Sequence, residues 1–207
     1  MIPLHTTGIG LQGINLTKIN FGYDVVVGNG IGAGDLEDND NNKSITVSAH
    51  IKPYEGLRIG ASYYHDVISK GVENHHGSHS ESGGIDEAIT QQIFGGSFAF
   101  FKKKIELLAE GTYVNNYSDS LQNKNTYGLY AHAGYRIKNK IIPFVRYDKV
   151  NYAKNDMWFK TANRQAFIGG IRYEFSYLAV IKAEYQLNDF ETGDDNETVT
   201  IQFAIGF

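Results

Sequence analysis

The 207-residue sequence contains no cysteine and only three prolines. Without cysteine the chain has no disulfide framework, no thiolate metal site and no cysteine nucleophile. No segment approaches the roughly 18 consecutive apolar residues that suggest a membrane-spanning helix. The formal net charge of −4 gives no excess of basic residues, which argues against a nucleic-acid binder. Disulfide-rich scaffolds, helical membrane proteins and nucleic-acid-binding proteins are therefore disfavoured.

Glycine and aromatic residues are abundant instead, with 23 Gly, 14 Tyr and 12 Phe. This composition is typical of many β-strands that are joined by tight turns and carry aromatic side chains. Hydrophobic residues make up 42% of the chain, so it is not compositionally disordered. We expect residues 1–207 to form a single domain.

The last ten residues, TVTIQFAIGF, show a clear strand pattern. Side chains alternate between the two faces of an extended strand, so Val199, Ile201 and Phe203 share one face with Ile205 and Phe207. The residues between them are small or polar. This pattern suits a lipid-facing strand of an outer-membrane β-barrel, although a buried terminal strand of a soluble protein has the same pattern.

Alternating segments of this kind recur along the chain between turn signals. Each is about 10 residues long, which matches the ~9–11 residues that a tilted strand needs to cross a bilayer. We predict eleven strands, near residues 5–14, 19–28, 44–52, 57–66, 90–101, 105–115, 126–137, 141–150, 165–175, 178–188 and 198–207.

The connections between these strands are of two kinds. Short ones at 15–18, 53–56, 102–104, 138–140 and 176–177 alternate with long polar ones at 29–43, 67–89, 116–125, 151–164 and 189–197. Bacterial outer-membrane barrels place short turns at the periplasmic rim and longer loops at the other rim. A soluble sandwich has no reason to place every long loop at one end. We therefore predict an all-β fold, an antiparallel transmembrane β-barrel in the bacterial outer membrane.

The strand number and the amino terminus both indicate that this sequence is part of a larger barrel. Bacterial barrels have an even number of strands, so eleven strands leave one edge unpaired. The amino-terminal residues MIPLHTTGIG show neither the basic region nor the apolar region of a signal peptide. We expect a mature or truncated chain that forms the carboxy-terminal part of the barrel.

In the predicted barrel, one face of each strand is apolar and the other carries the charges. In residues 127–137, for example, Leu129 and Ile137 face outward, whereas His132 and Arg136 face inward. A charged side chain that faces lipid at mid-depth costs about 2–4 kcal/mol, so only this register suits a membrane strand. The predicted pore-lining residues are Lys52, Arg58, Glu106, Glu110, His132, Arg136, Arg146, Asp148, Arg172, Glu174, Lys182 and Glu184.

Several segments resemble outer-membrane porins of Gram-negative bacteria. The segments HTTGIGLQG (5–13), FGYDVVVGNG (21–30), PFVRYD (143–148) and IKAEYQL (181–187) are similar to the carboxy-terminal part of the phosphate-selective porin O and P family. Ile205 and Phe207 resemble the carboxy-terminal signal that the barrel-assembly machinery reads in such proteins. Gln202 departs from that signal, which tends to have glycine at this position.

The resemblance implies a porin through which small hydrophilic solutes or ions diffuse passively, with outer-membrane lipid and the barrel-assembly machinery as partners. Asp24 and Asp66 also face inward in this register, so carboxylates are at least as numerous as cations on the inward face and the phosphate preference is not carried over. We expect no cofactor and no nucleic-acid partner. Assembly into a homo-oligomer is possible. The alternative is a structural or adhesive barrel, in which paired charges plug the lumen and the outer loops bind a partner.

Other candidate chemistry is weaker. His75, His76 and His79 have spacings that could chelate a metal in a rigid loop, but the glycine and serines around them favour a polar outer loop without a metal. The acidic segment 34–42 lacks the spacing of a calcium-binding loop. No G-x-S-x-G motif accompanies the inward His132, so we do not expect an enzyme, and a membrane-embedded hydrolase is a third hypothesis.

Overall fold

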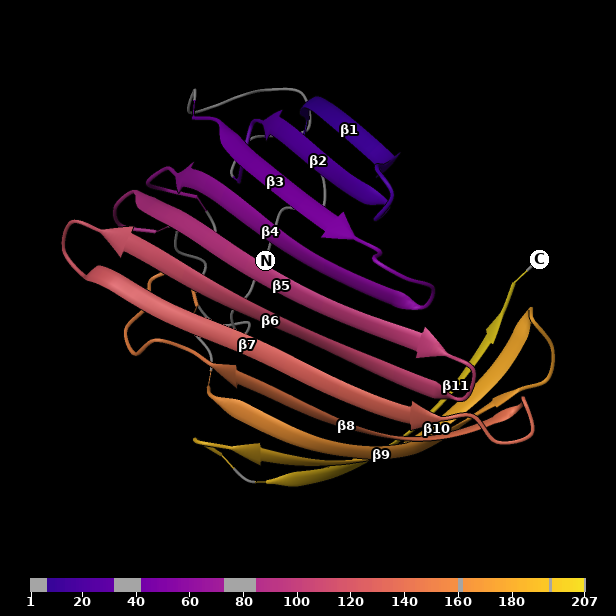
Figure 1. Ribbon diagram of the computed structural model, residues 1–207. Coiled ribbons are helices and arrows are strands. Elements are labelled where there is room, and N and C mark those ends of the chain that lie inside the picture. The colour runs from indigo at the N-terminus through magenta and orange to yellow at the C-terminus, as the bar shows by residue number, and fades with distance from the viewer. Residues whose placement is uncertain (1–6, 32–41, 73–84, 160–161, 194, 207) are drawn as a thin grey trace.

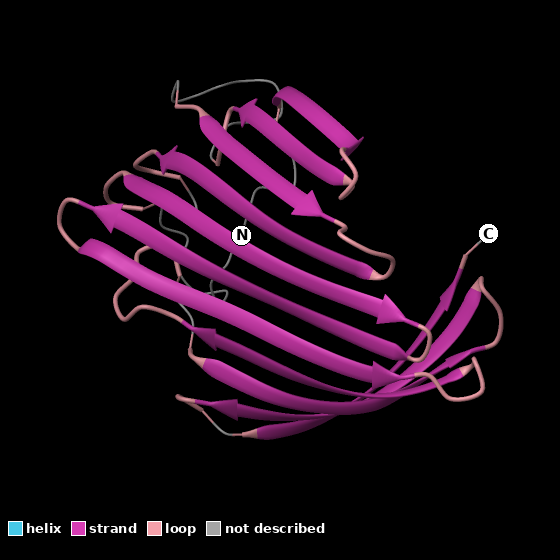
Figure 2. Ribbon diagram, in the orientation of Figure 1, coloured by secondary structure: helices cyan, strands magenta, loops and turns pink. Residues whose placement is uncertain are grey.

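The computed structural model describes residues 7–31, 42–72, 85–159, 162–193 and 195–206. In these residues the chain is all β, and eleven antiparallel strands form one sheet in which each strand pairs with its neighbours in sequence (Figure 1). Figure 2 shows that the described connections between these strands are turns and loops. The strands are β1 (Gly8–Leu16), β2 (Phe21–Gly28), β3 (Ser44–Ile51), β4 (Leu57–Ile68), β5 (Ile89–Lys102), β6 (Ile105–Ser118), β7 (Gln122–Tyr135), β8 (Ile141–Asn151), β9 (Arg164–Glu174), β10 (Ala179–Phe190) and β11 (Asn196–Ile205).

The sheet is strongly curved, and β8 to β11 turn away from the plane of β3 to β7 (Figure 1). Its two edge strands, β1 and β11, are not paired with each other in the described residues, so the sheet is open. The predicted all-β antiparallel architecture with eleven strands is confirmed. Among the described residues, no helix has the length and apolarity needed to cross a membrane.

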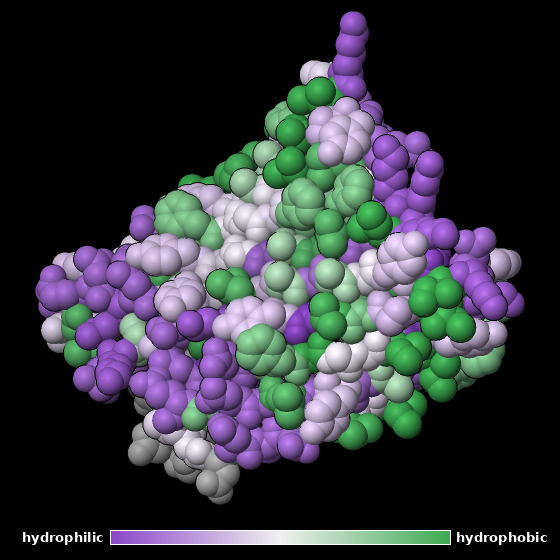
Figure 3. Space-filling view, turned by 60° about the horizontal axis from the view of Figure 1, so that its bottom comes forward, coloured by the Kyte–Doolittle hydropathy of each residue, from purple (hydrophilic) through white to green (hydrophobic). Residues whose placement is uncertain are grey.

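The strand register separates the two faces of the sheet. Ile171 on β9 lies opposite Ala183 on β10, whereas the next residue, Arg172, lies opposite Lys182. The apolar set lies on the outer, convex face and is exposed, with 64% of Val145 accessible. Figure 3 shows apolar and aromatic residues running across the middle of one side of the molecule, with hydrophilic residues gathered toward its margins. The sequence pattern and the register therefore agree on which residues share a face.

The turns at one end of the sheet are short because a few residues adopt left-handed backbone conformations. Lys103, between β5 and β6, has φ 52°, and Asn139, between β7 and β8, has φ 61°. Gly56, before β4, has φ 86°, and a Cβ at this position would lie only 2.1 Å from the Phe101 carbonyl oxygen. Glycine is required there by both the backbone conformation and this close approach.

One predicted loop is wrong. We expected a long polar connection over residues 116–125, but β6 and β7 continue through most of it and leave only residues 119–121 between them. Asn115 lies opposite Asn125 and Asn116 lies opposite Lys124 in the ladder. Polar residues in this stretch are therefore strand residues, because backbone pairing continues past the apolar part of each strand. Strand lengths accordingly range from 8 to 14 residues.

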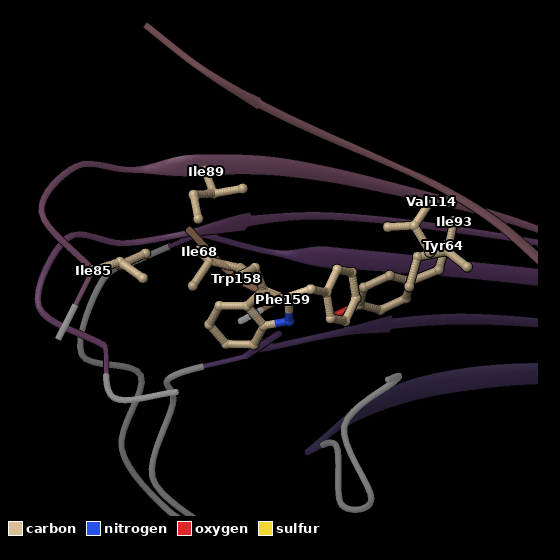
Figure 4. Packing of buried hydrophobic residues seen from close by; sticks show 8 residues of the cluster. All are labelled: Tyr64, Ile68, Ile85, Ile89, Ile93, Val114, Trp158 and Phe159. Atoms are coloured by element: carbon tan, nitrogen blue, oxygen red, sulfur yellow. The ribbon is translucent and has the colours of Figure 1, made fainter. Parts of the chain in front are cut away.

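The main buried cluster lies on the inner, concave face. Tyr64, Ile68, Ile89, Ile93 and Val114 contribute side chains from β4, β5 and β6. The remaining buried members, Ile85, Trp158 and Phe159, come from segments between strands (Figure 4). A short sheet-only chain thus obtains a core by folding connecting segments onto its concave face.

Candidate functional site

The concave face carries the residues that the sequence predicts to line a pore. Ten of the twelve lie within strands on this face, as the pairing register requires. Arg136 follows directly after the end of β7, and Lys52 follows directly after the end of β3. The structure therefore places the predicted set on one surface, and it brings several members into direct contact.

Four of these residues form an ion-pair network near the short-turn end of the sheet. The Glu106 carboxylate accepts hydrogen bonds from Arg136 Nη2 at 2.8 Å and from Arg172 Nη2 at 2.8 Å. The Glu174 carboxylate also accepts from both arginines, at 3.1 Å from Arg136 Nη2 and 3.2 Å from Arg172 Nε. Glu106 is the most buried member, with 6% of its side chain exposed. Each arginine therefore bridges two carboxylates, which links β6 to β9 across the curved face.

Two further ion pairs lie on the strands that flank β9, one within β8 and one within β10. The Arg146 guanidinium donates two hydrogen bonds to Asp148, both at 2.6 Å, and it lies 5.2 Å from the ring centroid of Tyr130. Lys182 Nζ lies 2.9 Å from Glu184 on β10. Most of the predicted lining charges are thus paired, as charges in a partly buried setting usually are.

A hollow of about 260 Å³ lies over β3 to β6. Its wall is rich in hydroxyl groups and glycines, and two predicted lining residues, Arg58 and Glu110, lie at it. Ser48, Ser62, Ser97 and Thr112 supply the hydroxyl groups. Short polar side chains leave space for water above the sheet, and their hydroxyl groups can both donate and accept hydrogen bonds.

The connection between β8 and β9 differs from the predicted outer loop. We expected residues 151–164 to form a polar loop at the rim, but Trp158 and Phe159 are only 2% and 5% exposed. They pack on the inner side of β4 to β6, against the cluster that includes Tyr64 and Val114 (Figure 4). We call residues 152–159 the inner loop. Its apolar pair is buried because a tryptophan and a phenylalanine would lose their hydrophobic stabilisation at a solvated rim.

Asp156 fixes the inner loop to the sheet. Its carboxylate accepts hydrogen bonds from Asn116 Nδ2 at 3.0 and 3.2 Å, and from the backbone N–H groups of Trp158 at 2.7 Å and Phe159 at 3.2 Å. Gln91 Nε2 in turn donates to Asn116 Oδ1 at 2.9 Å. Burial raises the pKa of the Asp156 carboxyl, and the hydrogen bonds from the loop backbone and Asn116 only partly oppose that change.

Strand periodicity does not predict that this connection is buried. The signal that could have found it is local: the only tryptophan of the chain is followed by phenylalanine inside an otherwise polar connection. A large apolar pair in such a segment indicates a segment that folds back onto the protein. Polar partners such as Gln91 and Asn116 could not be assigned without knowing which strands face the loop.

The structure describes only some of the remaining predicted residues. His132 lies on the concave face and stacks on Phe144, with ring centroids 5.1 Å apart. Ile205 is the last residue of β11 and is 59% exposed. The histidines at 75, 76 and 79 and the terminal Phe207 lie outside the described residues, as does the acidic segment except for Asn42.

No known family model matches the sequence, and no curated protein matches it either. Among solved structures, the chain is similar to the CymD monoaromatic hydrocarbon channel, with a TM-score of 0.48 and 10% sequence identity. The alignment covers 98% of this chain and 66% of that channel, so the chain spans slightly less than two thirds of the channel's length. Membership of the porin O and P family stays a prediction.

Proposed function

We propose that this chain is the carboxy-terminal part of an outer-membrane β-barrel channel through which small hydrophilic solutes or ions diffuse passively. The concave face is its aqueous lining and the convex face contacts lipid. The predicted lining residues, the outer-membrane location and the assembly role of Ile205 and Phe207 belong to this proposal.

The observation that supports it most is the exposed apolar face. From β1 to β11 the convex side carries large accessible side chains, among them Ile9 at 84%, Phe167 at 58% and Ile201 at 69%. Soluble proteins expose such residues singly, whereas a continuous apolar surface marks contact with another apolar phase. The charged and hydroxyl-bearing residues lie on the opposite face, which is the arrangement of a barrel around water.

The open edges of β1 and β11 add a requirement. In hydrocarbon the unpaired backbone groups of an edge strand have no water to hydrogen-bond, so a membrane sheet must close. The proposal therefore includes further strands, which pair with these two edges and complete an even-numbered barrel.

The alternative is a narrow structural or adhesive barrel with a plugged lumen. Two observations favour it: the inner loop packs on the concave face through Trp158 and Phe159, and Glu106 and the two arginines it contacts close part of that face with ion pairs. Against a full plug stands the hydroxyl-lined hollow, which keeps about 260 Å³ of open space. No catalytic activity is proposed, since His132 stacks on an aromatic ring and, among the described residues, no nucleophilic side chain is hydrogen-bonded to it.

Single-channel conductance in planar bilayers tests the proposal. The full-length protein, with the strands that complete the barrel, is expected to conduct, and Thr112→Trp, which fills the hollow, is expected to lower conductance at least about twofold. Ala131→Trp is the matched control, because Ala131 lies on the convex face of β7, opposite Ala109 and Tyr147, and does not line the hollow. Well-folded protein that never conducts would refute the channel and favour the plugged barrel.

A further inference from the structure

A second hollow on the concave face has a different lining. It encloses about 440 Å³ over β6 to β10, at the base of the inner loop. Its wall holds three aromatic rings, two arginines and the carboxylates of Glu110 and Asp148, whereas hydroxyl groups and glycines make up much of the first hollow. Its lining includes the side chains of Tyr130, Arg146, Val150, Tyr152, Arg164 and Phe190.

The two arginines of this hollow are not equivalent. The Arg146 guanidinium is neutralised by two hydrogen bonds to Asp148 at 2.6 Å. The Arg164 guanidinium lies 5.9 Å from the ring centroid of Phe190, and no described carboxylate lies within ion-pair distance of it. Lys149 also borders the hollow, but it lies opposite Leu129 in the register of the convex face. Arg164 is therefore the cation on the concave side of this hollow that has no described carboxylate, Glu110 included, within ion-pair distance.

The surroundings of Arg164 are flat and apolar. Phe190 lies directly opposite it on β10, and Val150 lies opposite it on β8. Tyr152 follows β8 and lines the same hollow. A guanidinium fork can bind a carboxylate through two parallel hydrogen bonds, and aromatic faces beside it favour a planar apolar group on the same molecule.

We infer that this hollow binds small organic anions that carry a planar apolar group, such as aromatic carboxylates. The carboxylate binds the Arg164 guanidinium, and the ring lies against Phe190 and Tyr152. This inference rests on the proposed function, because it requires the concave face to be accessible to solutes from the aqueous phase.

The lining discriminates against two other kinds of solute. An inorganic anion such as phosphate would gain from Arg164 but not from the apolar wall, and it would lose hydration beside Phe190. A neutral sugar or aromatic alcohol would gain from the rings but would leave the charge of Arg164 without a counter-ion. Only a molecule with both features uses both parts of the hollow.

Equilibrium binding to the folded full protein in detergent tests the inference independently of transport. Isothermal titration with benzoate, acetate, benzyl alcohol and phosphate is expected to rank benzoate first, by roughly tenfold over each of the others, because only benzoate combines the charge-assisted bond with ring contact. Equal binding of acetate or tighter binding of phosphate would overturn the inference.

Three variants locate the site. Arg164→Gln is expected to weaken benzoate binding roughly tenfold and Phe190→Leu severalfold, whereas Arg164→Lys retains part of the affinity through its charge. Arg58→Gln is the matched control, since it removes the same charge from the other hollow. A loss with Arg58→Gln equal to that with Arg164→Gln would show a general charge effect and reject the site.

The same protein in planar bilayers separates the two proposals. Benzoate binding without conductance would refute the channel and leave the binding site intact. Conductance with no benzoate preference, and no change in Arg164→Gln or Phe190→Leu, would refute the binding site and leave the channel intact. Circular dichroism of each variant shows whether the sheet has formed, and Phe190→Leu tests the site even if Arg164→Gln fails to fold.

Discussion

Asn116 on β6 donates its side-chain amide to both carboxylate oxygens of Asp156, at 3.0 and 3.2 Å, across 40 residues of sequence. Both residues are buried, at 2% and 5% exposure. This contact joins the inner loop to the wall of the sheet and sets the position of Trp158, two residues further on. Because the chain has one tryptophan, its fluorescence reports on this loop alone.

Asn116→Ala should release the inner loop. The substitution removes the amide donor and leaves a buried carboxylate with fewer partners, which costs about 1–3 kcal/mol. We expect the emission of Trp158 to shift to longer wavelength and its quenching by iodide to increase. Asn115→Ala is the control, because the Asn115 side chain bonds Asn125 at an exposed position of the same strand. Unchanged emission in Asn116→Ala would show that apolar packing alone holds the loop.

Docking of the inner loop should weaken as pH rises. Burial raises the pKa of Asp156 in the docked loop, so the docked state favours the protonated carboxyl more than the released state does. Its contribution to docking is therefore fully present below the ordinary carboxyl pKa of about 4 and is lost as pH rises through the raised value. Lys124 is the cation whose charge opposes this shift. Emission of Trp158 between pH 3 and pH 8, roughly the range spanned by ordinary and raised carboxyl pKa values, measures the change.

Asp156→Asn separates this carboxyl from the other acids of the concave face. The amide stays neutral and still offers an oxygen to the backbone N–H groups of Trp158 and Phe159. We expect its Trp158 emission to be nearly independent of pH over the same interval. A variant that keeps the full pH dependence would assign it to other carboxylates, such as those of the ion-pair network.

The sequence could predict which face of the sheet each strand residue occupies. Side chains alternate between the two faces with a period of two, so placing the charged residues on one face assigns every other residue of the strand. Ile171 and Arg172 lie on the faces that this rule gives them, and the neighbour pairing follows from connections that are short at one end. Loop conformation has no such period. The sequence pattern ends β6 too early because Asn116 and the residues after it are polar. It does not predict the buried position of the inner loop, because the burial of Trp158 depends on contacts with β4 to β6.

For the candidate site, the sequence could predict which face of the sheet its residues occupy but not which residues contact one another. Glu106, Arg136, Arg172 and Glu174 were expected on the concave side, but their joining into one network depends on curvature that brings β6 near β9. Arg164 was placed in a loop by its sequence neighbours, and the structure has it as the first residue of β9. Pairing across strands, rather than any property of a single strand, determines these contacts.

Glu106→Ala should destabilise the fold more than Glu184→Ala. Glu106 contacts two arginines and is 6% exposed, whereas Glu184 contacts Lys182 and is 15% exposed. Removing one partner of a buried ion pair costs about 3–5 kcal/mol, and we expect about 2 kcal/mol here because each arginine remains partly exposed. Urea unfolding in detergent micelles measures both variants, and equal midpoints would show that the network adds no stability beyond a single pair.

Ile201→Arg tests which face of the sheet meets lipid. Ile201 lies on the convex face of β11 and is 69% exposed, so an arginine there would face hydrocarbon and cost about 2–4 kcal/mol at mid-depth. Thr200→Arg is the control, because Thr200 lies on the concave face opposite Glu184, where an added cation gains a counter-charge. We expect Ile201→Arg to lower the yield of folded protein in lipid vesicles and Thr200→Arg to leave it near the unmodified level. Equal folding of the two variants would mean that the convex face does not contact hydrocarbon, and the membrane assignment would fail with it.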